Sequence, residues 1–181
     1  VDGRMSIKLA PSAPGDSATD VFAVVQDAIQ RGRVLECQYE SLSQIPGEEP
    51  EWFELHPYAL HFSQRAWYVV GHHDGRGEVR NLRLTRFVAI DIGDASFQVP
   101  KGFSMDGHLG DAWLLIRGDT RYDVKIRFSP EFADTIAETR WHRTMEVEDQ
   151  EDGGLLFTYS VEGLDEIVLW VLSMGPNAEV I

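Results

Sequence analysis

Cysteine and long apolar runs are almost absent from this chain. Cys37 is the only cysteine among the 181 residues. A single thiol excludes an internal disulfide and a cluster of thiolate ligands, and it indicates a reducing compartment. No apolar run approaches the roughly 20 residues that a transmembrane helix needs, and the first residues lack the apolar core of a signal peptide. We therefore expect a cytoplasmic protein with no membrane partner.

Basic side chains are also scarce. The chain has 16 lysines and arginines against 30 acidic residues, which gives a formal net charge of -14. A surface that coats nucleic acid depends on many distributed basic groups that neutralise phosphates, so the composition excludes that class. The segment Arg65–Arg86 differs, because it holds five arginines against two acidic residues. We expect any contact with nucleic acid to be local.

Recognisable catalytic motifs are missing as well. We find no nucleophile elbow, P-loop or dinucleotide fingerprint, and no helix pattern follows Gly75–Gly77, which therefore predicts a turn. The adjacent residues His72–Asp74 would splay apart, and a zinc site needs a further distant ligand. We predict that the chain is not an enzyme and needs no metal or cofactor. An enzyme acting on nucleotides remains a third hypothesis.

Apolar periodicity predicts a mixed α+β fold. Residues 1–19 have the proline, glycine and serine content of a linker. A helix is expected from Asp20, as N-cap, to Gly32, and a half-buried strand follows with Leu35, Cys37 and Tyr39 facing inward.

Three more strands are expected in the following segment, over residues 52–62, 66–71 and 79–94. Pro57 would bend the first of them, as in a small curved barrel. In a regular last strand, Arg80 and Arg86 share a face and Arg83 takes the other, unless a bulge shifts the register.

Residues 34–94 resemble a WYL domain. Four features match that family's pattern in order and spacing, namely Tyr39, Pro57–Leu60, Trp67–Val69 and the arginine-rich run Arg80–Arg86. The resemblance implies an SH3-like or Sm-like small β-barrel over residues 20–100, of a kind found mostly in bacterial transcription regulators. The chain departs from the pattern at Val69, where leucine is usual, and at Glu54 and His56, where a basic residue is often found.

The second half predicts a βαββαβ order. Its expected elements are strand 124–128, helix 130–140, strands 144–149 and 155–161, helix 163–173 and strand 178–181. Ser129 and Pro130 have the chemistry of a helix start, and Asp152–Gly154 that of a hairpin turn. This order is typical of a ferredoxin-like module over residues 123–181, after a connection over 101–122 that includes a helix at 103–115. It resembles the C-terminal extension that often follows a WYL domain.

The resemblance implies a ligand-binding face made of Tyr39, Tyr68, Arg80, Arg83 and Arg86. Arginine forks grip phosphate or carboxylate oxygens and stack on planar rings. Each residue also has a structural interpretation: the arginines would form surface ion pairs, and Tyr39 would be a core aromatic. We expect Trp67 to pack in the core and regard Ser41 and Ser63 as weaker candidates.

These features together predict a ligand-sensing piece of a bacterial transcription regulator. Its effector would be a nucleotide or a short single-stranded nucleic acid, and it would form a homodimer. Such regulators usually begin with a winged helix-turn-helix, and no such pattern occurs here, so we expect either a fragment whose DNA-binding domain lies upstream or a stand-alone relative. The alternative is a purely structural dimerisation module that binds no ligand.

Overall fold

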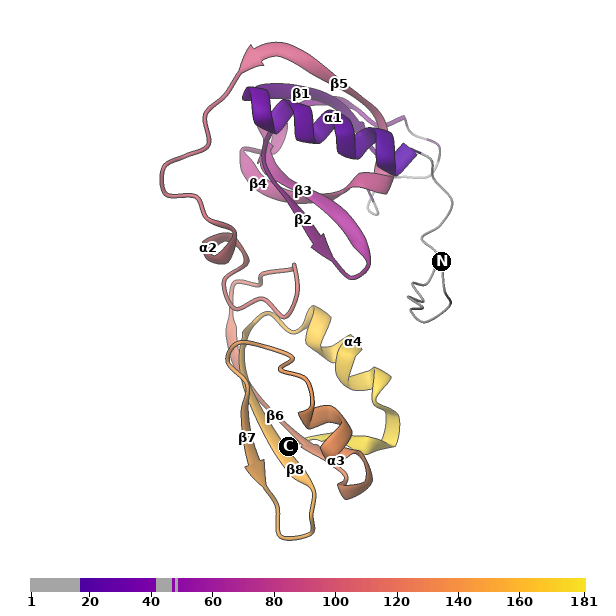
Figure 1. Cartoon of the computed structure of the whole chain (residues 1–181), viewed down its shortest axis with the longest axis vertical. Helices are drawn as coiled ribbons and strands as arrows, with labels where there is room; N and C mark the ends of the chain where they lie inside the picture. Colours follow the sequence, from indigo (N-terminus) through magenta and orange to yellow (C-terminus); the bar gives the residue numbers. More distant parts are fainter. Residues whose placement is uncertain (1–16, 42–46, 48) are drawn as a thin grey trace, which may run out of the picture. The chain divides into compact units, whose positions relative to one another are not determined.

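The computed structural model describes residues 17–41, 47 and 49–181, and it divides the chain into two compact units. The first unit is Val1–Phe103 and the second is Ser104–Ile181. Most of the expected linker over residues 1–19 lies outside the described residues. Each unit has its own antiparallel sheet and at least one helix, so the mixed α+β prediction is confirmed (Figure 1). Each unit also has its own apolar core. None of the helices described is long and apolar enough to cross a membrane.

The first unit opens with helix α1, Ser17–Arg31. The helix starts three residues before Asp20, so Asp20 lies in its first turn and is not the N-cap that we expected. A carboxylate there still complements the positive end of the helix dipole. Gly32 ends the helix with a φ of +60°, a conformation that glycine adopts without steric cost.

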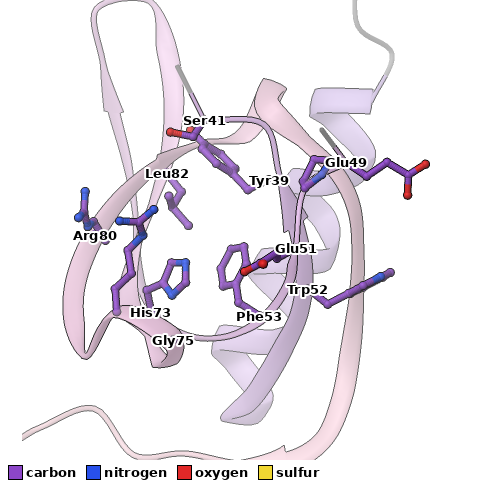
Figure 2. A pocket seen from close by; sticks show the side chains of 12 residues that line it. Tyr39, Ser41, Glu49, Glu51, Trp52, Phe53, His73, Gly75, Arg80 and Leu82 are labelled. Carbon is purple, nitrogen blue, oxygen red and sulfur yellow. The ribbon is translucent and has the colours of Figure 1, made fainter. Parts of the chain in front are cut away.

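Five strands follow α1 and form one sheet. They are β1 Arg33–Tyr39, β2 Trp52–Ser63, β3 Ala66–His73, β4 Glu78–Arg83 and β5 Phe87–Ser96. Their order in the sheet is β4-β3-β2-β1-β5, and the strands are strongly curved (Figures 1 and 2). The core between helix and sheet contains Val21, Val25, Ala28, Leu35, Cys37, Leu55, Val69, Leu82, Leu84 and Phe87.

The expected bend at Pro57 is confirmed. Pro57 is buried inside β2, and the β2–β3 register shifts between Pro57 and Ala59. A shift of this kind is a β-bulge, which bends the strand that carries it. Gly71 lies opposite Pro57, and a Cβ atom there would stand only 2.5 Å from the carbonyl oxygen of His56. The two strands therefore approach closely at the bend, and only glycine fits.

The prediction of a single strand over residues 79–94 is wrong. A 3-10 turn, η2 Leu84–Arg86, divides it into β4 and β5, which lie at opposite edges of the sheet. Leu84 is buried in the core and anchors the turn, and the backbone N–H of Glu40 donates to the carbonyl oxygen of Arg86 at 2.9 Å. Arg86 consequently belongs to a turn, so alternation along one strand does not relate it to Arg80.

The predicted core position of Trp67 is also wrong, because 42% of its surface is exposed. Trp67 stands opposite Phe62 near the end of the β2–β3 hairpin, and Phe62 is itself exposed. The Trp67 ring contacts Phe62, at 5.3 Å between ring centroids, and forms a T-shaped contact with Phe22 of α1, at 4.9 Å. These contacts cover only part of the indole.

The second unit has the element order β-α-β-β-α-β after a short first helix. Its elements are α2 Met105–Leu109, β6 Arg121–Phe128, α3 Pro130–Ala137, β7 Glu146–Asp149, β8 Leu155–Glu162, α4 Asp165–Ser173, η3 Gly175–Asn177 and β9 Ala178–Val180. The sheet order is β7-β8-β6-β9, and all neighbours are antiparallel. Ser129 is the N-cap residue of α3, as expected, with Pro130 next to it. The core gathers Trp113, Ile126, Phe128, Ile136, Phe157, Tyr159, Val161 and Ile167.

The helix expected over residues 103–115 is reduced to the five residues of α2, which ends at Gly110 with a φ of +56°. The residues after it form a loop held by a carboxylate. Glu166 Oε2 accepts hydrogen bonds from the backbone N–H groups of Leu114, Leu115 and Ile116, at 2.9, 2.9 and 3.0 Å. Three backbone donors that a helix would have paired are therefore satisfied by one side chain.

Candidate ligand-binding site

The first unit contains a pocket of about 860 Å³ beside the ends of β1 and β3 and the start of β2 (Figure 2). Its lining consists of Tyr39, Ser41, Glu49, Pro50, Glu51, Trp52, Phe53, His73, Gly75, Arg76, Arg80 and Leu82. Two of the five predicted ligand-binding residues, Tyr39 and Arg80, are among them. Of the two weaker candidates, Ser41 lines the pocket, whereas Ser63 ends the β2 strand.

Aromatic rings form one part of this pocket. The rings of Phe53 and His73 are stacked, with centroids 3.9 Å apart and planes 7° from parallel. Leu55 of β2 pairs with His73 of β3, and Phe53 lies two residues before Leu55 on the same face of the strand. The sheet register therefore brings the rings of Phe53 and His73 together. The ring of Tyr39 packs edge-on against Phe87 at 5.1 Å. The pocket thus offers flat apolar surface to a planar ligand.

Two guanidinium groups add positive charge. Arg76 belongs to η1 Asp74–Arg76 and Arg80 to β4, so both come from the hairpin between β3 and β4. Arg80 pairs with Glu78 at 2.5 Å, but both side chains are about half exposed. Exposed pairs of this kind contribute little to stability. A ligand anion can therefore replace Glu78 as the partner of Arg80 at a small cost in free energy.

His73 is held neutral in this environment. Burial lowers its pKa below the usual value of 6.5, and the charges of Arg76 and Arg80 lower it further. Its Nδ1 atom is buried and finds no hydrogen-bond partner outside its own residue in the described part of the chain. At neutral pH the ring therefore stacks as a flat, uncharged group.

Acidic and aromatic residues occupy another side of the pocket. Glu49 and Glu51 precede β2 and are exposed, and Trp52 has 56% of its surface exposed. Figure 2 shows Arg80 on the opposite side of the pocket from Glu49 and Trp52. The pocket consequently carries both signs of charge.

Tyr68 and Arg83 lie elsewhere, on the other face of the sheet. Tyr68 pairs with Arg83 on β4 and with His61 on β2, which makes a cross-strand row. The next pair, Val69 and Leu82, is buried in the core, and side chains alternate between faces along a strand. The Nε atom of Arg83 is buried without a hydrogen-bond partner among the described residues.

The five predicted residues therefore lie in three places. Tyr39 and Arg80 line the pocket, Arg86 lies in the η2 turn, and Tyr68 and Arg83 lie in the row with His61 on the other face of the sheet, which we call the outer row. One contact joins two of them, since the backbone N–H of Arg83 donates to the hydroxyl of Tyr39 at 3.0 Å. No sequence pattern indicated that Phe53, His73 and Arg76 would line the same pocket. The glycines of the hairpin that contains His73 and Arg76 predict only a turn, although this hairpin belongs to the same positive segment as Arg80.

Comparison with known families decides what these units are. Residues 20–92 match the model of the WYL domain, and residues 120–181 match that of the WCX domain. The chain carries a WYL domain followed by a WCX domain. The resemblance drawn from the sequence is therefore confirmed, and the 860 Å³ pocket belongs to the WYL domain. The described residues of both domains contain no group of three His, Cys, Asp or Glu side chains placed to share a metal ion.

Two solved structures are similar over most of this chain. One is the proteasome accessory factor B/C (PafBC) of Arthrobacter aurescens, with 20% identity and a TM-score of 0.43, matched over 95% of this chain and 25% of its own. The other, a CRISPR Cas-related protein, has 11% identity and a TM-score of 0.57, matched over 91% of this chain and 47% of its own. The chain thus spans less than half the length of each, and the second shows a shared fold alone. No curated protein matches the sequence.

Proposed function

We propose that this chain is the effector-sensing part of a transcription regulator, and that its WYL domain binds a nucleotide or a short single-stranded nucleic acid. The observation that carries the proposal is one pocket in which the stacked rings of Phe53 and His73 accompany the guanidinium groups of Arg76 and Arg80. Bases stack on aromatic faces, and arginine binds phosphate. We assign no catalytic role to the chain.

The size and charge of the pocket set limits on this binding. A volume of about 860 Å³ lies within the range of small-molecule sites. Because the whole chain has a net charge of -14, only local arginines attract an anion, and the affinity for nucleic acid should be modest and should fall steeply with salt.

We also propose a fold type for each unit and a way in which ligand binding affects the regulator. The curved sheet within residues 20–100 is taken as an SH3-like or Sm-like barrel, and residues 123–181, joined to it by residues 101–122, as a ferredoxin-like module. The sheet order β7-β8-β6-β9 supports the second assignment. A DNA-binding domain upstream and a homodimer would complete the regulator. The ligand must bind one arrangement of these parts more tightly than another, because equal affinity for both would leave the equilibrium between them unchanged.

A second contact surface has its own support. Tyr68 and Arg83 are paired across β3 and β4, and the buried Arg83 Nε is unpaired in the described part of the chain. The row that they form with His61 is an alternative place for the effector, outside the pocket.

A structural role without a ligand is the second candidate function. The Arg80–Glu78 ion pair favours it, and so do the exposed apolar residues Val168, Leu169 and Leu172 of α4, which suit a dimer contact.

Fluorescence anisotropy with labelled six-nucleotide DNA and RNA strands, at two salt concentrations, tests the proposal. Arg80→Ala should weaken binding about tenfold, as the loss of a charge-assisted contact does. Arg31→Ala is the matched control, because Arg31 is also an exposed arginine paired with one carboxylate, Asp27. If Arg83→Ala abolishes binding and Arg80→Ala does not, the outer row is the site. If the wild-type chain binds neither strands nor free nucleotides, the proposal is wrong and the structural role is the remaining candidate function.

A further inference from the structure

The lining of the WYL-domain pocket contains both arginine and glutamate side chains. Arg76 and Arg80 come from the β3–β4 hairpin, whereas Glu49 and Glu51 come from the chain just before β2. In Figure 2, Arg80 and Glu49 lie on opposite sides of the pocket, and Glu51 is drawn between them, near Phe53. The stacked rings of Phe53 and His73 belong to the same lining.

These two kinds of side chain recognise different chemical groups. A guanidinium group only donates hydrogen bonds, and it attracts anions. An ionised carboxylate only accepts hydrogen bonds, so it binds hydroxyl or amino groups and repels phosphate. The ligand that satisfies the whole pocket therefore has an anionic group, a flat ring and several neutral donors.

A single ribonucleotide has this combination with only one phosphate on the sugar, whereas each internal sugar of an oligonucleotide lies between two phosphates. A nucleoside 5′-monophosphate has its phosphate at one end of the sugar and the free 2′ and 3′ hydroxyls at the other. In a strand, the 3′ hydroxyl is replaced by a second phosphate, which Glu51 and Glu49 would meet as a like charge. Carboxylates that bind a ribose hydroxyl occur in other nucleotide-binding folds, and the 2′ hydroxyl distinguishes RNA from DNA.

Building on the proposed function, we infer that the pocket selects a ribonucleoside 5′-monophosphate with a free ribose diol. Arg76 and Arg80 hold the phosphate, the base lies against the Phe53–His73 stack, and Glu51 accepts hydrogen bonds from the ribose hydroxyls. Deoxyribonucleotides and internal segments of a nucleic-acid strand bind more weakly.

Isothermal titration calorimetry with the 181-residue chain tests this selection. The ligands are AMP, GMP, CMP and UMP, their 2′-deoxy counterparts, and a six-nucleotide DNA strand. We expect at least one ribonucleotide to bind about tenfold more tightly than its deoxy form, the effect of one hydrogen bond to a charged group. Glu51→Gln keeps the shape and removes the charge, so it should reduce this ratio and strengthen binding of the strand. Glu54→Gln should change neither, because Glu54 is an exposed β2 carboxylate outside the pocket lining.

The outcomes separate this selection from the broader function. If the strand binds more tightly than every mononucleotide and Glu51→Gln leaves that order unchanged, the selection is wrong and nucleic-acid sensing stands. A preference for ribose that survives both Glu51→Gln and Glu49→Gln overturns the role of the carboxylates. If neither mononucleotides nor strand bind, both the selection and the proposed function fail.

Discussion

The hydroxyl of Tyr39 accepts a hydrogen bond from the backbone N–H of Arg83 at 3.0 Å. Tyr39 ends β1 and Arg83 ends β4, and two other strands separate β1 from β4 in the sheet. The bond therefore spans the curved sheet and connects residues that strand pairing leaves apart. Tyr39 thus has a structural role and also lines the pocket.

Replacing this hydroxyl tests its structural role. Tyr39→Phe keeps the ring against Phe87 and leaves the Arg83 N–H without its acceptor, so we expect a loss of about 1 kcal/mol in the free energy of unfolding. Urea denaturation followed by circular dichroism measures the change. Tyr122→Phe is the control, because Tyr122 is an exposed tyrosine of the second unit. Equal stability of the wild type and Tyr39→Phe would show that the bond contributes nothing.

The bend at Pro57 makes Gly71 irreplaceable. In Gly71→Ala the new Cβ would lie 2.5 Å from the backbone oxygen of His56, and relief of this overlap requires the strands to move apart. We expect a loss of roughly 2 kcal/mol or more, as for other overpacked positions, measured by urea denaturation. Gly102→Ala should be nearly neutral, since no heavy atom lies within 4 Å of its added Cβ. A Gly71→Ala chain as stable as the wild type would contradict the close approach.

Local patterns predicted much of the first sheet because they depend only on neighbouring residues. The alternation of Leu35, Cys37 and Tyr39 and the bend at Pro57 were both recognisable in this way. The break at Leu84–Arg86 was not, because Leu84 continues the apolar pattern of the strand, and its burial in the tertiary core is what makes the chain turn.

The pocket was only partly predictable for a related reason. The resemblance identified Tyr39 and Arg80, whereas the Phe53–His73 stack joins residues 20 positions apart and depends on the β2–β3 register. Trp67 was misplaced because its exposure depends on how far α1 covers the hairpin end. Alternation along a strand predicts which residues share a face, but it does not predict which other element covers that face.

Glu166 pairs three backbone N–H groups of the loop after α2. Glu166→Ala removes the acceptor of the N–H groups of Leu114, Leu115 and Ile116. We expect the second unit to lose about 2 to 3 kcal/mol and these three amides to exchange with solvent at least tenfold faster, as measured by hydrogen exchange. Glu179→Ala, at an exposed carboxylate of β9, should change neither quantity. Unchanged exchange at the three amides would contradict this role of Glu166.

His73 should make ligand binding depend on pH. Burial and the nearby Arg76 and Arg80 depress its pKa below 6.5, so the ring is neutral at pH 7 and gains a proton only as the pH falls below its depressed pKa. A bound anion stabilises the protonated ring and raises that pKa, so by linkage the affinity for an anion must increase as the pH falls. Anisotropy from pH 7.5 to pH 5 with an oligonucleotide lacking a terminal phosphate measures this increase, because its phosphodiesters do not titrate there. In His73→Asn the added dependence should disappear, whereas in His61→Asn, on the outer row, it should persist. An affinity that is constant over this range in the wild type would place the anion away from His73.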